Sequence, residues 1–135
     1  MRNLVLLFVL LSASCYGQSP VELADLQLTG YNERNIDKFL QAYSDSVRVF
    51  NFPNTLLYKG KPTMRQNYSS MFEQLPDLHC TIKSRVVIGN TIIDEEQVRF
   101  RKDQPELHAV AIYKIGMAKY KKCILLQKDD GRTTG

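Results

Sequence analysis

The feature that most constrains this fold is a change in the spacing of apolar residues near residue 79. Before that point apolar residues recur at helical spacing, whereas later segments alternate apolar and polar residues with the period of a β-strand. The alternating segments are 79–88, 91–101, 107–115 and 118–127. Gly89-Asn90 separates the first two and is typical of a two-residue hairpin turn. The pattern predicts helices followed by a long antiparallel meander, which is an α+β arrangement.

Three helices are expected before the meander. The first begins at Ser19-Pro20-Val21-Glu22, which has the pattern of a capping box. Asn35 is expected to cap the second, whose apolar stripe runs from Ile36 to Tyr43. The third opens at Pro62 and stops at Pro76. Its buried face is expected to contain Met64, Tyr68 and Phe72. Short strands at 47–52 and 55–58 precede it, and a strongly curved sheet over the three helices would enclose an apolar cavity.

Residues 1–17 are typical of a secretory signal peptide. A basic start is followed by the eight apolar residues 4–11 and by the small residues Ser12-Ala13-Ser14. The apolar run is too short to remain in a bilayer, since a spanning helix needs about 20 apolar residues. Two cleavage sites are open: one frees Gln18, and the other makes Cys15 a lipidated first residue. We therefore expect an exported domain, residues 18–127, with a frayed tail at 128–135.

Composition excludes some classes of partner. The formal net charge is +4, from 18 basic and 14 acidic residues, which is too small for a nucleic-acid-binding surface. Membrane contact is expected only through lipidation at Cys15. Cys80 and Cys123 remain, and their spacing leaves a disulfide and two buried free thiols both open. No Cys-x-x-Cys or His-x-x-x-His spacing occurs, so a classical zinc site is not expected. No cofactor is expected either.

Several motifs follow one another in an order that points to a known superfamily. They are Tyr31-Asn32-x-Arg34-x-x-Asp37-x-Phe39-Leu40-x-x-Tyr43, Val47-Arg48-Val49-Phe50-x-Phe52-Pro53, Tyr58-x-Gly60, Met64-Arg65-x-x-Tyr68 and Gly89-Asn90-x-x-Ile93-Asp94-x-Glu96. The order resembles the SnoaL-like branch of the nuclear transport factor 2-like superfamily, which also holds steroid delta-isomerase-type proteins. The resemblance covers about residues 21–127. It implies an α+β cone with a ligand cavity at its open end and a homodimer formed through the sheet.

The resemblance also implies where catalytic groups would lie. The isomerases place a tyrosine on the first helix, a carboxylate base at the end of the first strand and a second carboxylic acid on a later strand. The matching positions here are Gln27, Asn51 and the segment 109–113, which contains no carboxylate. Asn51 cannot accept a proton at neutral pH, so steroid isomerisation by the family mechanism is not expected.

Asp94 and Glu96 are the leading candidates for chemistry. Alternation puts both on the apolar side of their strand, where loss of water raises the pKa of a carboxyl group and suits it to acid–base work. The alternative is structural: with the turn at Gly89-Asn90, Arg85 would face Asp94 and Lys83 would face Glu96 as ordinary cross-strand ion pairs. His108, at a strand entrance, is a third candidate because histidine titrates near neutrality. His79 is expected to be structural and to meet Phe100 across the ladder.

Aromatic residues are expected to line the cavity. The set is Tyr43, Phe50, Phe52, Tyr58, Tyr68 and Phe72. Together they would form an apolar wall with hydroxyl groups, which suits a small hydrophobic molecule. Two functions follow from these residues: isomerase-type acid–base chemistry without a cofactor, or a non-catalytic module for ligand binding or dimerisation.

Overall fold

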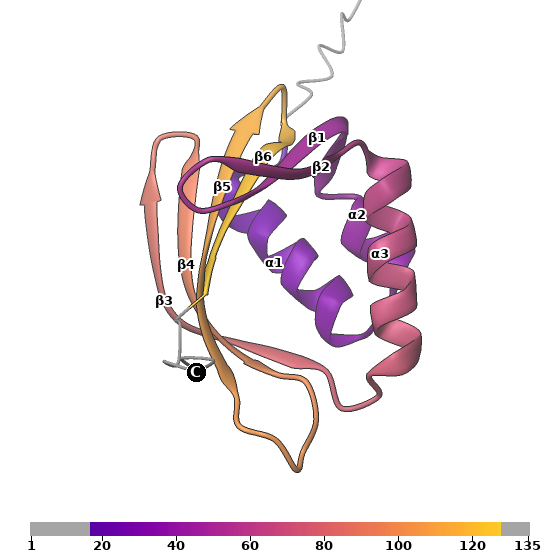
Figure 1. Cartoon of the computed structure of the whole chain (residues 1–135). Coiled ribbons are helices and arrows are strands. Elements are labelled where there is room, and N and C mark those ends of the chain that lie inside the picture. Colours follow the sequence, from indigo (N-terminus) through magenta and orange to yellow (C-terminus); the bar gives the residue numbers. More distant parts are fainter. Residues whose placement is uncertain (1–16, 128–135) are drawn as a thin grey trace, which may run out of the picture.

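The computed structural model describes residues 17–127 (Figure 1). Its elements are α1 (Pro20–Asn32), α2 (Ile36–Leu40), β1 (Tyr43–Asn51), β2 (Thr55–Lys59), α3 (Lys61–Gln74), β3 (His79–Ile88), β4 (Thr91–Arg99), β5 (Leu107–Gly116) and β6 (Lys119–Gln127). The expected leader up to Tyr16, with Cys15, and the expected tail at 128–135 lie outside the described residues. Within the described part of the chain, every helix is too short or too polar to cross a membrane.

The first helix begins where the capping box predicts. The backbone N–H of Glu22 donates to Ser19 Oγ over 3.2 Å, and the backbone N–H of Ser19 donates to Glu22 Oε2 over 2.7 Å. Gly30 then lets α1 approach α2 closely, because a Cβ at this position would lie 2.4 Å from the backbone nitrogen of Phe39. The expected cap of the second helix is also confirmed: Asn35 Oδ1 accepts a hydrogen bond from the backbone N–H of Lys38.

The second helix is shorter than its apolar stripe predicts. It ends at Leu40, and Tyr43 is instead the first residue of β1, where it pairs with Tyr120 of β6. The Tyr43 ring still packs on Phe39, with 5.1 Å between ring centroids. The apolar spacing therefore identified residues that do pack together, but Tyr43 reaches the cluster from a strand and not from the helix.

The six strands form one sheet in the order β2-β1-β6-β5-β4-β3. The predicted α+β architecture and the antiparallel meander β3-β4-β5-β6 are confirmed. The sheet is mixed, however, since β1 and β6 are parallel neighbours. Alternation fixes which face a side chain occupies but not the direction of the neighbouring strand, so the pattern could not reveal this pair.

Two of the cross-strand contacts expected from the sequence are wrong, because β3 contains a β-bulge. Arg85 faces Asp94 as predicted, but the register shifts between Ile82 and Ser84. As a result Ile82, not Lys83, faces Glu96, and His79 faces Arg99 rather than Phe100. One extra residue in a strand moves every later pair by one position.

The helices lie on the concave side of the curved sheet, with α1 running across it and α3 beside it (Figure 1). The third helix buries Met64 and Phe72 as predicted, while Tyr68 is only partly buried. Phe72 packs edge-on against Tyr31 and Phe39, with centroid separations of 5.7 and 5.8 Å. This aromatic cluster joins the three helices at one end of the sheet.

Candidate functional site

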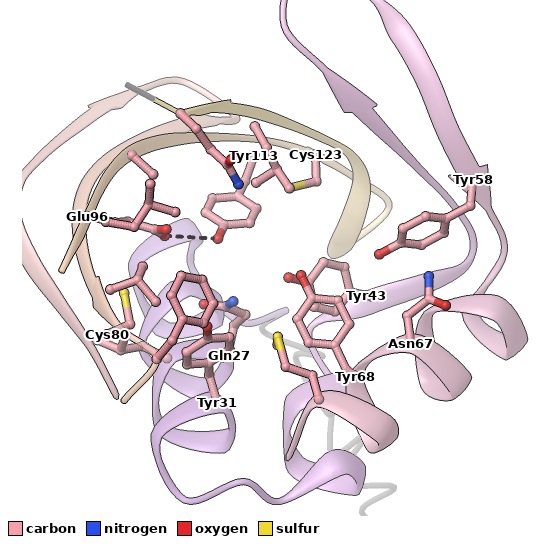
Figure 2. Close-up of a pocket in the computed structure, with 18 residues that line it drawn as sticks. Gln27, Tyr31, Tyr43, Tyr58, Asn67, Tyr68, Cys80, Glu96, Tyr113 and Cys123 are labelled. Atoms are coloured by element: carbon pink, nitrogen blue, oxygen red, sulfur yellow. Dashed lines mark hydrogen bonds between the residues drawn. The ribbon is translucent and has the colours of Figure 1, made fainter. Parts of the chain in front are cut away.

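A cavity of about 330 Å³ lies between the concave face of the sheet, α1 and α3 (Figure 2). Its size is at the lower end of the range for small-molecule sites. The lining residues are Gln27, Leu28, Tyr31, Tyr43, Tyr58, Asn67, Tyr68, Met71, Cys80, Glu96, Val98, Phe100, Leu107, Ala109, Tyr113, Cys123, Leu125 and Gln127. The wall is mainly apolar, with hydroxyl, amide and thiol groups set into it.

Half of the aromatic residues expected at the ligand are in this wall. Tyr43, Tyr58 and Tyr68 line the cavity. The other three do not. Phe50 lies on the opposite face of the sheet, where the Arg48 guanidinium is 4.9 Å from its ring centroid. The side chain of Phe52 is half exposed beside the turn after β1, and Phe72 belongs to the aromatic cluster between the helices.

Glu96 is the predicted acid–base residue that the structure places at the cavity. Its side chain projects from β4 into the wall, where the Tyr113 hydroxyl donates a hydrogen bond to Glu96 Oε1 over 3.3 Å (Figure 2). Burial, reinforced by the nearby charge of Asp94, raises the pKa of Glu96 to about 7. The hydrogen bond from Tyr113 acts in the opposite direction and limits that increase. Glu96 can therefore both accept and release a proton near neutral pH.

Asp94 has a different environment. Its side chain is almost fully buried, with Oδ1 2.6 Å from Arg85 Nε and Oδ2 2.8 Å from a terminal Arg85 nitrogen. Arg85 also donates to Asp25 of α1 over 2.8 Å. Asp94 is not among the residues that line the cavity. The structural alternative, an ion pair with Arg85, describes its position, and the three residues tie α1 to β3 and β4.

His108 is not brought to the cavity either. Its Nε2 is 2.8 Å from Glu95 Oε1 on the outer face of the sheet, and both side chains are exposed to solvent. Glu95 also accepts a hydrogen bond from Ser84, and this contact, followed by that with His108, lowers the pKa of Glu95. The three predicted acid–base candidates therefore occupy three separate environments.

Two polar groups of the wall, Tyr113 and Asn67, were not singled out from the sequence. Tyr113 is the most important, and alternation along β5 with Ala109 and Ala111 would have placed it on the cavity side. Burial raises the pKa of Tyr113 well above its ordinary value, so the phenol stays protonated and can donate a hydrogen bond. Gln27, expected at the position of the family tyrosine, is indeed in the wall, whereas Asn51 is exposed and does not line it.

The two cysteines whose pairing the sequence did not decide are free thiols. Cys80 of β3 and Cys123 of β6 are both buried and both line the cavity. Burial raises the pKa of each thiol, so neither carries the thiolate that nucleophilic chemistry needs. Within residues 17–127, no three His, Cys, Asp or Glu side chains gather as they would around a metal ion.

Solved structures with the same fold come from several bacteria. A cystatin-fold protein from Novosphingobium aromaticivorans is 22% identical and has a TM-score of 0.73, over 82% of this chain and 99% of that chain. An NTF2-like protein of unknown function from Cytophaga hutchinsonii is 9% identical and has a TM-score of 0.69, over 82% and 90%. An LEH-like epoxide hydrolase from M. tuberculosis is 9% identical and has a TM-score of 0.66, over 81% and 82%.

At these identities the structural likeness shows the fold alone. No curated protein matches the sequence. The sequence itself matches the SnoaL-like domain over residues 26–119, which confirms the resemblance in the motifs. This chain belongs to the SnoaL-like domain family.

Proposed function

We propose that this domain binds a small, mainly apolar molecule in its cavity and exchanges a proton with it through Glu96. One observation carries the proposal: a carboxyl group with a pKa of about 7 borders a cavity large enough for a ligand. A group whose pKa lies near the working pH combines useful populations of both protonation states, so it is suited to general acid–base catalysis. The reaction class would be an isomerisation, cyclisation or hydration that needs only proton transfer.

The other polar groups of the wall would orient the ligand. Tyr113 would hold the Glu96 carboxyl through its hydroxyl proton, which is not lost at neutral pH, and its oxygen can accept a hydrogen bond from the ligand. Gln27 and Asn67 present amide groups from α1 and α3. A few such groups in a mainly apolar wall fix the orientation of a ligand whose binding comes from burial of apolar surface.

The experiment compares Glu96→Gln with Glu95→Gln. Both changes remove a carboxyl from β4, but Glu95 projects from the outer face and is absent from the cavity wall. Native mass spectrometry of the purified protein would first identify a co-purifying ligand. With that ligand, Glu96→Gln should lower turnover by about 10²–10⁴-fold while binding persists. Glu95→Gln should keep both turnover and binding at the wild-type level. Equal turnover in the wild type and Glu96→Gln would refute the catalytic role.

We also propose that the domain acts after export, with residues 1–17 removed or with Cys15 lipidated. The basic start, the apolar run 4–11 and the small residues after it support this proposal. Expression of the whole chain in a bacterial host, followed by mass analysis of the N-terminus, tests it. A product that starts at Gln18 or at an acylated Cys15 is expected, and folded cytoplasmic protein that keeps Met1 would contradict export.

The alternative role as a dimerisation module has an observation of its own. On the outer face of the sheet, an apolar side chain on each strand lies opposite an apolar one on the next, in a row across all six strands. The row is Leu56, Phe50, Ile124, Ile112, Ile93 and Val86. Phe50 itself is buried beneath Arg48 and Lys122, whereas Leu56 and Val86 are exposed and the three isoleucines are partly exposed. Exposed apolar side chains gathered on one face of a protein mark interaction sites.

We propose that a second copy of the chain covers this row. Size-exclusion chromatography with light scattering should give a dimer for the wild type and a monomer for Ile112→Glu. The control is Gln104→Glu in the exposed loop before β5, which should remain dimeric. A monomeric wild type would contradict the proposal.

A further inference from the structure

The charges around the cavity are unbalanced. Among the described residues that line it, Glu96 is the only Asp, Glu, Lys, Arg or His. No cation of the wall can therefore neutralise Glu96 when it ionises. An ionised carboxylate in a water-poor site is costly unless an opposite charge lies close to it.

The nearest cation behind the wall is already paired. Arg85 holds both oxygens of Asp94 and one oxygen of Asp25. These three groups sum to one net negative charge before Glu96 is counted. Ionised Glu96 would bring the total to two negative charges against this side of the cavity. The field that a ligand meets here favours positive charge.

The rest of the wall suits a cation with an apolar body. The titratable side chains near Glu96 are phenols and thiols. Burial, together with the charge of Glu96, raises their pKa values and keeps them neutral and protonated. They are Tyr31, Tyr68, Tyr113, Cys80 and Cys123. Five tyrosines line the cavity, and the face of an aromatic ring attracts an ammonium group that lies over it. An anionic ligand would meet the carboxylate without any compensating basic residue among the described wall residues.

We infer that the cavity takes a hydrophobic amine whose protonated nitrogen pairs with the Glu96 carboxylate. This inference rests on the proposed function, because it assigns a chemical class to the ligand of the same cavity. The ammonium group would donate to Glu96 Oε1 or Oε2, and the apolar part would lie against the sheet. Tyr113 would keep its hydrogen bond to the carboxylate and so hold it in place for the ligand.

Three probes of nearly equal shape test the inference: phenethylamine, phenethyl alcohol and phenylacetate. They carry a positive, a neutral and a negative head group on the same ring. We expect the wild-type protein to bind the amine at least about tenfold more tightly than the alcohol, the difference that one charge-assisted hydrogen bond can supply. Phenylacetate should bind most weakly. NMR titration measures the weak affinities that such small probes give.

The variants identify the responsible charge. Glu96→Gln should abolish the preference for the amine while the affinity for the alcohol changes little, and Glu95→Gln should keep the wild-type order. In the wild type, the affinity for phenethylamine should fall between about pH 8 and about pH 6, because Glu96 takes up a proton while the amine keeps its own. The comparison of the three probes on wild-type protein remains decisive even if Glu96→Gln fails to fold.

Each contrary result has a distinct meaning. Equal affinity for amine and alcohol would overturn the inference and leave the cavity proposal intact, as would tighter binding of phenylacetate. A preference for the amine that survives Glu96→Gln would also overturn it, since the charge would then come from elsewhere. Failure of all three probes to bind would reject the inference and the cavity as a ligand site together.

Discussion

Tyr113 reaches Glu96 over 3.3 Å although the two are not cross-strand partners. In the ladder between β4 and β5, Tyr113 faces Ile92 and Glu96 faces Ala109. The phenol can extend along its own strand because Ala109 and Ala111, the residues that precede it on the same face, have small side chains. The small side chains of these two alanines therefore leave room for the hydrogen bond, and the bond limits the rise in pKa of the only carboxyl in the described wall.

Tyr113→Phe should raise the pKa of Glu96 above its value of about 7. The lost hydrogen bond is one that lowers this pKa, and its removal leaves burial and the charge of Asp94 to act with less opposition. The measurement is an NMR titration of the Glu96 carboxyl carbon. Tyr120→Phe is the matched control, because the buried Tyr120 hydroxyl has no hydrogen-bond partner among the described residues and its ring stacks on Tyr113. A Glu96 pKa that stays constant in Tyr113→Phe would contradict the geometry.

Glu96 should make the folded protein less stable as the pH rises through neutrality. Its pKa is about 7 in the folded chain against an ordinary value of 4.5, so between these values the folded state binds more protons than the unfolded state. The contribution is fully present below about pH 4.5 and is lost as the pH rises through about 7, with a total of about 3 kcal/mol.

Urea unfolding of the wild type and Glu96→Gln at about pH 5 and about pH 8 measures this contribution. The free energy of unfolding of the wild type should fall relative to that of the variant as the pH rises. If the two proteins keep the same difference at both pH values, Glu96 does not have a raised pKa.

Asp94→Asn should destabilise the fold by about 3 kcal/mol, the lower part of the range for removal of one partner from a buried ion pair. Asp94 is 1% exposed and holds Arg85 through two oxygens, while Asp25 remains to compensate part of the arginine charge. Asp25→Asn should cost less than about 1 kcal/mol, since the Asp25 side chain is largely exposed. Chemical denaturation measures the free energy of unfolding of the two variants. Similar losses in both would contradict the prediction that the buried carboxylate contributes more than the exposed one.

Phe72→Ala should cost about 3–5 kcal/mol of the free energy of unfolding, the usual loss when an aromatic side chain is removed from a core. Its ring joins α3 to Tyr31 and Phe39. Phe52→Ala provides the comparison, because Phe52 is 50% exposed and its loss should change stability by about 0.5 kcal/mol or less. Thermal unfolding followed by circular dichroism gives both values, and a small effect at Phe72 would argue against the aromatic cluster.

Local patterns were sufficient for much of the fold. The two-residue turn at Gly89-Asn90 fixes the register beside it, and the predicted contact of Arg85 with Asp94 is confirmed. Counting residues outward from the turn gives the wrong partner for Lys83, because the local sequence does not indicate that this strand contains one extra residue. A bulge depends on the curvature that the whole sheet adopts, and the spacing of apolar residues does not record it.

The site was less predictable for the same reason. Alternation correctly placed Asp94 and Glu96 on one face of β4, and the turn register offered Arg85 as the partner of Asp94. Neither pattern could show that Glu96 opens into the cavity while Asp94 does not. The cavity forms where α1 and α3 pack over the sheet, and these helices contribute Gln27 and Tyr68 to its wall. Which carboxyl faces the cavity thus depends on packing between segments that are distant in the chain.

The parallel contact between β1 and β6 has a consequence for the order of assembly. Among the described strands, this is the only pairing that joins the β1–β2 hairpin to the rest of the sheet. It involves β6, the last described strand. Long-range contacts of this kind form slowly, since much of the chain must be ordered before they can close. Cys123, Leu125 and Gln127 then enter the wall from β6. A chain still emerging from the ribosome can complete its helices and the β3–β4 hairpin, but the cavity wall stays incomplete until β6 is added.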